Sequence, residues 1–273
     1  SNIAHVIKAM NNNKGADIVG LSEVENNGVL EDLIADPQLK NLRYKIMHHD
    51  SPDGRGIDVA LIYKKNLMKV LDWKALPVNI SLYGERPTRD VLLITALVGS
   101  DTIYFFLNHW PSRREGKETS EPKRIVAASV VRKAVDSIMF IHPQAKILIM
   151  GDLNDNPTDK SIYEILKARK SPDLNNNLLY NCVYNFDWKK GEGSEFYRGD
   201  WSRFIQIIVS TSLIKNQIAS DGTFSDVYIF KQDWMLKKDA ATQQMIPERT
   251  FEDDGLIGFS DHLPVYIILK LSD

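Results

Sequence analysis

Hydrophobic residues recur along this chain in two spacings, one typical of helices and one typical of buried strands. Near the start, Ile3, Val6, Ile7 and Met10 follow the i, i+3, i+4, i+7 spacing of one helix face. The segment DIVGL at 17–21 then forms a short apolar run of the kind that predicts a buried strand. The pattern therefore predicts a chain that mixes helices with strands from its beginning.

Apolar runs predict most of the remaining elements. Further strands are expected at residues 44–49, 58–65, 91–98, 102–110, 146–150, 204–210, 226–230 and 263–271. Helices are expected around 29–34, at 121–141 and after Thr158. Short turns join several strands, so we expect a mixed sheet rather than a purely parallel one. Because no internal repeat or low-complexity linker interrupts the pattern, residues 1–273 are interpreted as one α/β-type domain.

Composition and charge narrow the class of protein. Of the 273 residues, 43% are hydrophobic and 26% are charged, which predicts a well-formed core. The formal net charge of -2 argues against a basic nucleic-acid-binding surface over the whole molecule, while a local basic patch remains open. Cys182 is the single cysteine, so a disulfide within the chain and a thiolate metal site are excluded.

The sequence says less about membrane insertion and cellular compartment. No apolar run reaches the roughly 18 residues of a membrane-spanning helix, so we expect a soluble protein. No secretory signal is visible, but the chain opens abruptly inside a helical pattern. A signal removed from the native N-terminus therefore stays possible, and the compartment stays undetermined.

Four polar clusters lie at the ends of apolar runs. They are LSEVEN at 21–26, NHWPSR at 108–113, GDLNDNP at 151–157 and SDH at 260–262. Each has an ordinary structural interpretation, since Gly, Asp, Asn and Pro form turns and a lone histidine is usually hydrogen-bonded within the fold. Antiparallel neighbours would nevertheless bring all four to one edge of a sandwich, and a single constellation would then explain them together.

The chemistry that uses these residue types together is metal-assisted phosphoester hydrolysis. Mg²⁺ prefers carboxylate and carbonyl oxygens, so Glu23 is a suitable anchoring ligand. A water must be deprotonated and aimed at phosphorus, a task for which His109 and His262 are the candidates. The amide of Asn154 can donate to the phosphate without adding negative charge, and Asp152 can orient the water.

The same stretches resemble the endonuclease/exonuclease/phosphatase superfamily, which has the pancreatic deoxyribonuclease-like fold. The matching segments, in family order across residues 16–265, are ADIVGLSEVEN, GIDVALIYK, TRDVLLITALV, NHWPSR, GDLNDNP and SDHLPV. The resemblance implies a four-layer α-β-β-α sandwich with two mixed, mostly antiparallel sheets. It also implies a phosphoesterase that depends on Mg²⁺ or Mn²⁺, with the site at one edge of the two sheets.

Residue by residue, the resemblance assigns a role to each polar position. The implied catalytic residues are His109, Asp152, Asn154, Asp261 and His262. The implied metal ligands are Glu23 together with Asp152, Asn154 and Asp261. Substrate contacts are expected from Arg89, Asn108 and Arg113, and Asp58 is expected to orient the first histidine, His109.

Two departures from the family pattern matter. The family opens with a strand that carries a metal-site asparagine, whereas this sequence begins at the following helix, so we expect one sheet to lack that strand. In addition, the family pattern W-x-x-I-D-Q-I-I-V-S places an aspartate where this chain has Ile205. Asp200 is five residues away, and an odd offset along a strand changes the face, so it cannot substitute directly.

These observations leave two hypotheses of function. The first is a monomeric phosphoesterase acting on a phosphodiester or phosphomonoester, with a lean toward nucleic acid because Arg113, Arg114 and Lys117 follow His109. Such a basic run is also common in solvated loops. The alternative is a weakened or inactive family member that serves as a binding protein, motivated by Ile205. Retention of Glu23 and the other site residues favours the enzyme.

Overall fold

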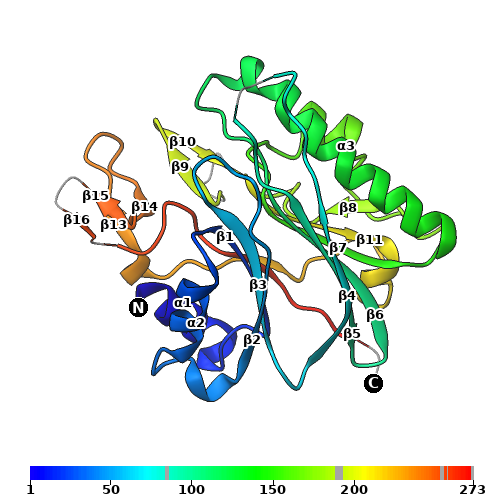
Figure 1. Cartoon of the computed structure of the whole chain (residues 1–273), viewed down its shortest axis with the longest axis horizontal. Helices are drawn as coiled ribbons and strands as arrows, with labels where there is room; N and C mark the ends of the chain where they lie inside the picture. The colour runs from blue at the N-terminus through cyan, green and yellow to red at the C-terminus, as the bar shows by residue number, and fades with distance from the viewer. Residues whose placement is uncertain (84–85, 188–192, 253–254, 257, 272–273) are drawn as a thin grey trace.

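Two β-sheets packed face to face form the centre of the molecule (Figure 1). The computed structural model describes residues 1–83, 86–187, 193–252, 255–256 and 258–271. The smaller sheet has the strand order β1-β3-β2, formed by β1 (Ile18–Val24), β3 (Asp58–Lys64) and β2 (Tyr44–His48). Its two strand pairs are both antiparallel.

The larger sheet contains the strand pair that carries the site. Its order is β4-β5-β6-β7-β11-β8, and its strands are β4 (Met68–Leu76), β5 (Val91–Val98), β6 (Asp101–His109), β7 (Lys146–Asp152), β11 (Ile205–Ser210) and β8 (Leu179–Asn181). Only β6 and β7 run parallel, and α3 (Lys117–Ile141) makes the crossover between them. The expectation of a mixed, mostly antiparallel sheet is therefore confirmed.

Alternation along the strands divides the core into layers. In β3, Leu61 points into the space between the sheets, while Ile62 points outward to α1 (Asn2–Asn13) and α2 (Asn27–Ala35). In β6, Phe105 likewise faces the inner core and Phe106 packs beneath α3. Helices thus cover the outer face of each sheet, which is the predicted four-layer α-β-β-α sandwich (Figure 1).

Short strands build a third region around the C-terminal half. The hairpin of β9 (Glu195–Tyr197) and β10 (Asp200–Ser202) packs through Phe196 and Trp201 against Val6 of α1 and against Leu263. The other short pairs are β12 (Val227–Ile229) with β17 (Val265–Ile267), β13 (Leu236–Lys238) with β14 (Met245–Pro247), and β15 (Phe251–Glu252) with β16 (Gly255–Leu256). The β9–β10 hairpin becomes important at the site.

Short helices complete the chain. They are 3-10 helices at Lys40–Leu42, Lys215–Gln217 and Asp233–Met235, the π-helix Ser161–Ile165, and α4 (Thr211–Ile214). The π-helix occupies the position of the helix predicted after Thr158. No helix in the described ranges is long and apolar enough to cross a membrane.

Most of the predicted elements agree with the structure to within a few residues. The strand at 91–98 is confirmed with its bounds, and the long helix begins four residues before the predicted 121. The predicted strand 263–271 is wrong in extent, since β17 covers only Val265–Ile267. Strand β4 was missed because it lies at a sheet edge, where most of its residues are partly or fully exposed and Lys69, Asp72 and Lys74 interrupt the apolar pattern.

Truncation of Phe106 should test the layer between the larger sheet and α3. Phe106→Ala removes a fully buried ring, so we expect the free energy of unfolding to fall by about 3–5 kcal/mol. Phe140→Ala is the matched control, since Phe140 lies on the same helix layer but is 89% exposed, and its effect should stay within about 0.5 kcal/mol. Urea unfolding of both variants measures the difference, and equal losses would contradict this core assignment.

Candidate active site

The parallel pair β6–β7 places two of the predicted catalytic residues side by side. His109 and Asp152 are the last residues of their strands, and they are direct partners across the pair. Gly151 makes this close approach possible, because a Cβ on that residue would lie 1.8 Å from the backbone oxygen of Asn108. Its φ of +137° is also one that residues with side chains rarely adopt.

The Asp152 carboxylate lies between two histidines. Its Oδ2 is 3.6 Å from Nε2 of His109 and 3.9 Å from Nε2 of His262. Both distances exceed the usual hydrogen-bond range, so the three groups face one another without direct hydrogen bonds. Catalytic contacts are often this long before a substrate is bound. The structure therefore brings together the predicted residues from the ends of β6 and β7 and from the segment before β17.

Burial sets the charges of this group. Desolvation of the His109 ring, reinforced by the positive charges of Arg89, Arg55 and His262, holds the pKa of His109 well below its usual value. The imidazole is therefore neutral at neutral pH. Desolvation likewise raises the pKa of Asp152, opposed by the charge of His262 and by the backbone N–H of Asn154. A carboxylate in this position favours a nearby positive charge.

Asn154 closes the turn after β7. Its backbone N–H donates to Oδ1 of Asp152 at 2.9 Å, and its φ of +49° is left-handed, a conformation that asparagine tolerates. Its side-chain Nδ2 donates to the backbone oxygen of Trp110 at 3.0 Å. This bond uses the amide nitrogen and leaves Oδ1 as the atom for a further contact. The segment GDLNDNP thus serves both as a turn and as part of the site.

A buried ionic network holds that turn in place. Asp155 accepts from Arg113 at 2.6 Å and lies 2.7 Å from Nε of Arg124, and both Asp155 and Arg124 are fully buried. Arg113 also donates to the backbone oxygen of Asn154 and to Asp159. These paired charges fix the backbone beneath the site, because an unpaired charge at this depth would carry a large desolvation cost.

The three residues expected to bind substrate have internal partners. Arg89 is buried and donates to the backbone oxygens of His109 and Trp110 and to Asp53. Asn108 donates to the backbone oxygen of Phe106 and accepts from the Trp110 indole. Arg113 holds the turn after β7, as described above. In this structure all three side chains therefore make hydrogen bonds within the protein, next to the site residues.

Asp58 and Glu23 lie at the corresponding edge of the smaller sheet. Asp58 accepts from the backbone and hydroxyl of Ser51, and its Oδ2 lies 3.1 Å from Nε2 of His48. The structure thus joins Asp58 to His48, and within the described residues the buried Nδ1 of His109 has no hydrogen-bond partner. The expected contact of Asp58 with His109 is not among the hydrogen bonds of the described residues.

Glu23 projects from an irregularity in β1. The register shifts between Ser22 and Val24 opposite β3, and Glu23 has a φ of +59°. Its side chain is 62% exposed, and Arg55 approaches it to 3.9 Å. Because the charge of Arg55 also acts on His109, Glu23 belongs to the same edge of the sandwich. Backbone strain of this kind often marks a functional position.

A carboxylate that sequence reasoning missed lies beside His262. Oε1 of Glu195, from β9, is 3.9 Å from Nε2 of His262, and the two residues form an isolated antiparallel bridge. Ligand atoms of Glu195, Asp261 and His262 lie within 4.8 Å of one another. Asp261 itself is exposed. The sequence offered no signal for Glu195, because the short β9–β10 hairpin lies far along the chain from residue 262.

Ile205 occupies the position where the family pattern has aspartate. It is the first residue of β11 and the direct partner of Asp152 across the antiparallel β7–β11 pair. Side chains of directly opposed residues lie on the same face of a sheet, so residue 205 is next to the Asp152 carboxylate. The substitution therefore changes the site itself and not its surroundings.

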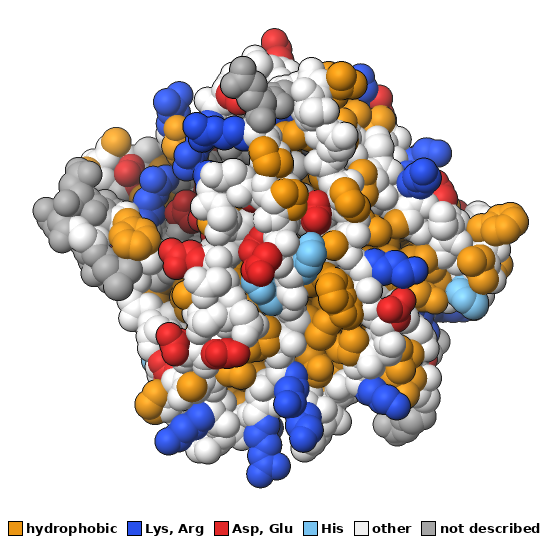
Figure 2. All heavy atoms as spheres, viewed as in Figure 1, with side chains coloured by type: hydrophobic (Ala, Val, Ile, Leu, Met, Phe, Trp, Pro, Cys, Tyr) orange, Lys and Arg blue, Asp and Glu red, His pale blue; other side chains and the backbone are white. Residues whose placement is uncertain are grey.

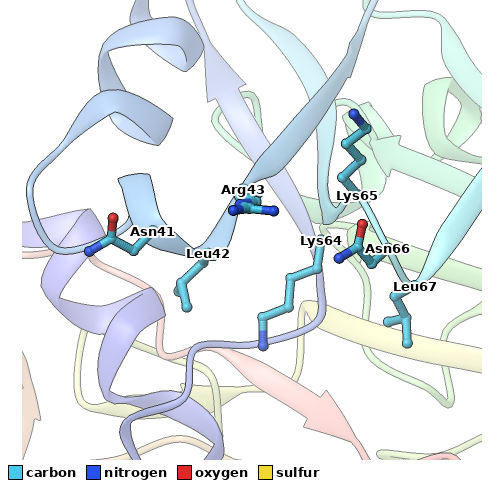
Figure 3. A pocket seen from close by; sticks show the side chains of 7 residues that line it. All are labelled: Asn41, Leu42, Arg43, Lys64, Lys65, Asn66 and Leu67. Carbon is cyan, nitrogen blue, oxygen red and sulfur yellow. The ribbon is translucent and has the colours of Figure 1, made fainter.

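Basic side chains do not dominate the face of the molecule drawn in Figure 2. On the face in Figure 2, acidic and histidine side chains share the centre, and most Lys and Arg side chains lie toward the margin. Figure 3 shows a surface hollow lined by residues 41–43 and 64–67. It includes Lys64, which lies at the opposite end of β3 from Asp58. The Lys64 ammonium group donates to Asp17 and to two backbone oxygens. The hollow is therefore separate from the site.

Comparison with known proteins identifies the family. The sequence model of the Endonuclease/Exonuclease/phosphatase family matches residues 1–271. Truncated TDP2 from Caenorhabditis elegans is similar in structure, with a TM-score of 0.59 and 19% identity over 96% of this chain and 86% of that one. No curated protein sequence matches.

Two further solved structures share the fold. TDP2 from D. rerio, complexed with a single-strand DNA product, has a TM-score of 0.56 and 15% identity over 98% of this chain and 92% of that one. The mannosyl-6-phosphatase of Bacteroides thetaiotaomicron VPI-5482 has a TM-score of 0.57 and 15% identity over 99% and 91%. The sequence resemblance is confirmed: the chain belongs to the endonuclease/exonuclease/phosphatase family of hydrolases that act on phosphoester bonds.

Proposed function

We propose that this protein is a divalent-metal-dependent phosphoesterase whose catalytic residues are His109, Asp152, Asn154, Asp261 and His262. The observation that carries the proposal is the Asp152 carboxylate held between His109 and His262 at the end of the parallel strand pair. Such an arrangement offers hydrogen-bond donors and acceptors toward one exposed edge. We further propose that residues 1–273 form a single catalytic domain that acts as a monomer.

The donor set fits Mg²⁺ or Mn²⁺. Glu23 supplies an exposed carboxylate, Asp152 and Asp261 supply two more, and Asn154 supplies an amide oxygen, all of them hard ligands. The raised pKa of Asp152 fits as well, since a cation would favour its ionised form. When bound, such a metal polarises the phosphoryl oxygen and offsets negative charge on the leaving oxygen.

The protein groups then have distinct roles. Neutral His109 can donate or accept a hydrogen bond at its Nε2 without adding charge. Asp152 can orient the attacking water, as its Oδ1 is already fixed by the Asn154 backbone. His262, which is more exposed than His109, can contact the phosphate or accept the proton of that water. Arg89, Asn108 and Arg113 act by supporting these groups and not by direct substrate contact.

We favour a nucleic acid as the substrate class, with a sugar phosphate as the second candidate. The DNA product bound to the D. rerio TDP2 supports the first, and the similarity to the Bacteroides mannosyl-6-phosphatase supports the second. Arg113 is engaged with Asp155 and Asp159, and Lys117 also pairs with Asp159. Among the described residues, Arg114 is therefore the exposed basic side chain of that run without such a partner. A net charge of -2 favours a short contact with nucleic acid over a long one.

The rival proposal is a binding protein with reduced catalysis. Ile205 beside Asp152 favours it, because an apolar side chain takes the place of a charged one. The same hydrolysis assays separate the two, since a weakened or inactive binding protein would turn over the members of a substrate panel poorly or not at all at any metal concentration.

His262→Ala should abolish most hydrolysis. Loss of the ring removes a group that contacts the phosphate or moves a proton, so kcat should fall by about 10²- to 10⁴-fold. Hydrolysis of single-stranded DNA, duplex DNA, RNA, a generic phosphodiester and a sugar phosphate measures the effect with Mg²⁺ or Mn²⁺ present. His142→Ala is the control, as that exposed residue follows α3 away from the site. Undiminished turnover in His262→Ala would refute the assignment.

Removal of metal should stop the reaction reversibly. We expect EDTA to abolish activity and added Mg²⁺ or Mn²⁺ to restore it. Glu23→Gln should raise the metal concentration that gives half-maximal activity by at least about tenfold, because it removes a charged ligand. Glu25→Gln, an exposed neighbour, should leave that concentration unchanged. Thermal stabilisation by Mn²⁺ gives an independent readout, and equal stabilisation of the two variants would exclude Glu23 as a ligand.

A further inference from the structure

We propose that Glu195 is the carboxylate that positions the His262 ring, and that it replaces the charge absent at residue 205. This inference rests on the proposed phosphoesterase function, which it deepens by adding a residue from outside the family motifs. Within the site, residue 205 faces Asp152 but has an apolar side chain. The second carboxylate near the His262 ring comes instead from another element, as Glu195 of β9.

The backbone brings Glu195 to that place. Ser194 accepts hydrogen bonds from two segments of the site. Its hydroxyl accepts from the N–H of Ile205 at 3.2 Å, and its backbone oxygen accepts from the N–H of Leu263 at 2.6 Å. Glu195 follows directly and pairs with His262 as an isolated bridge. The start of β9 is thus attached both to the strand that lacks the carboxylate and to the segment that carries the histidine.

The side chain of Glu195 is held toward the ring. Its Oε2 accepts a hydrogen bond from the hydroxyl of Ser202, its opposite neighbour in the β9–β10 hairpin, at 2.9 Å. Its Oε1 then lies 3.9 Å from Nε2 of His262, the same distance as Oδ2 of Asp152. The side chain is only 15% exposed, so its carboxylate loses part of its hydration and gains from nearby hydrogen-bonding or charged partners.

Two carboxylates therefore flank one ring nitrogen. This arrangement favours one orientation of the ring, as a carboxylate does for a histidine in other hydrolytic sites. Asp200, the nearest aspartate before residue 205 in sequence, cannot supply this charge, because it is exposed and pairs with Tyr197 at the other end of the hairpin. Glu195 is accordingly a positioning residue and not itself a group that touches phosphate.

Exchange of the carboxylate between the two positions tests the proposal. Glu195→Gln should lower kcat about 10- to 100-fold with little change in KM, because the ring loses its orientation while the phosphate contacts remain. Adding Ile205→Asp to that variant should raise kcat again by at least about tenfold. Glu195→Asp should retain more activity than Glu195→Gln. The control is Glu164→Gln, an exposed glutamate that should leave kcat unchanged.

Several outcomes would overturn the proposal. Unchanged kcat in Glu195→Gln would do so, as would a loss fully reversed by higher Mn²⁺ concentration, since Glu195 would then be a metal ligand. A folded double variant no more active than Glu195→Gln would show that residue 205 and Glu195 are not equivalent. Melting temperatures within a few degrees of the parent establish folding for each variant.

A readout without turnover separates this proposal from the proposed function. In ¹⁵N-labelled protein, the ring nitrogen signals of His262, assigned with His262→Ala, report the surroundings and hydrogen bonding of the ring. Glu195→Gln should shift them and Glu164→Gln should not. If no substrate is hydrolysed but the shift occurs, the phosphoesterase assignment fails while the Glu195–His262 pairing stands. Unshifted signals would refute the pairing whatever the activity.

Discussion

The parallel pairing of β6 with β7 is the constraint on which the site depends. Parallel strands need a long crossover, here α3, and they end at the same edge of the sheet, so His109 and Asp152 arrive next to each other. Gly151 permits the approach, because any side chain there would collide with the backbone of Asn108. The remaining groups of the site are brought to this pair by antiparallel neighbours and by a hairpin.

The arginine side chains next to His109 and Asp152 explain why these two residues can be buried. A histidine and a carboxylate with little solvent exposure lose hydration, and this loss must be offset by fixed dipoles and charges. Arg89 holds the backbone oxygens of His109 and Trp110, while Arg113 and Arg124 hold Asp155 in the following turn. Arg89 and Arg113, to which the resemblance assigns substrate contacts, therefore also hold the backbone around His109 and after Asp152.

Local pattern predicted the parts of the fold and site that depend on local causes. The ends of the two strands that carry His109 and Asp152 were predicted close to their observed positions, because apolar runs stop there at polar residues. The inward roles of Arg89 and Asn108 were not visible, since the burial of a polar side chain is decided by contacts with distant segments. Glu195 was invisible for the same reason: its partner His262 is distant in sequence, and a three-residue strand has too little periodicity to predict a face.

The spacing at the centre of the site supports a reaction in which a further group completes the contacts. Asp152 lies 3.6 Å from one histidine and 3.9 Å from the other, and Glu195 lies 3.9 Å from the second. Carboxylates at these distances gain less from the rings than direct hydrogen bonds would provide. A phosphate oxygen, a water or a cation placed among them would shorten the network. Only those new contacts that are stronger in the transition state than with the bound substrate would raise the rate.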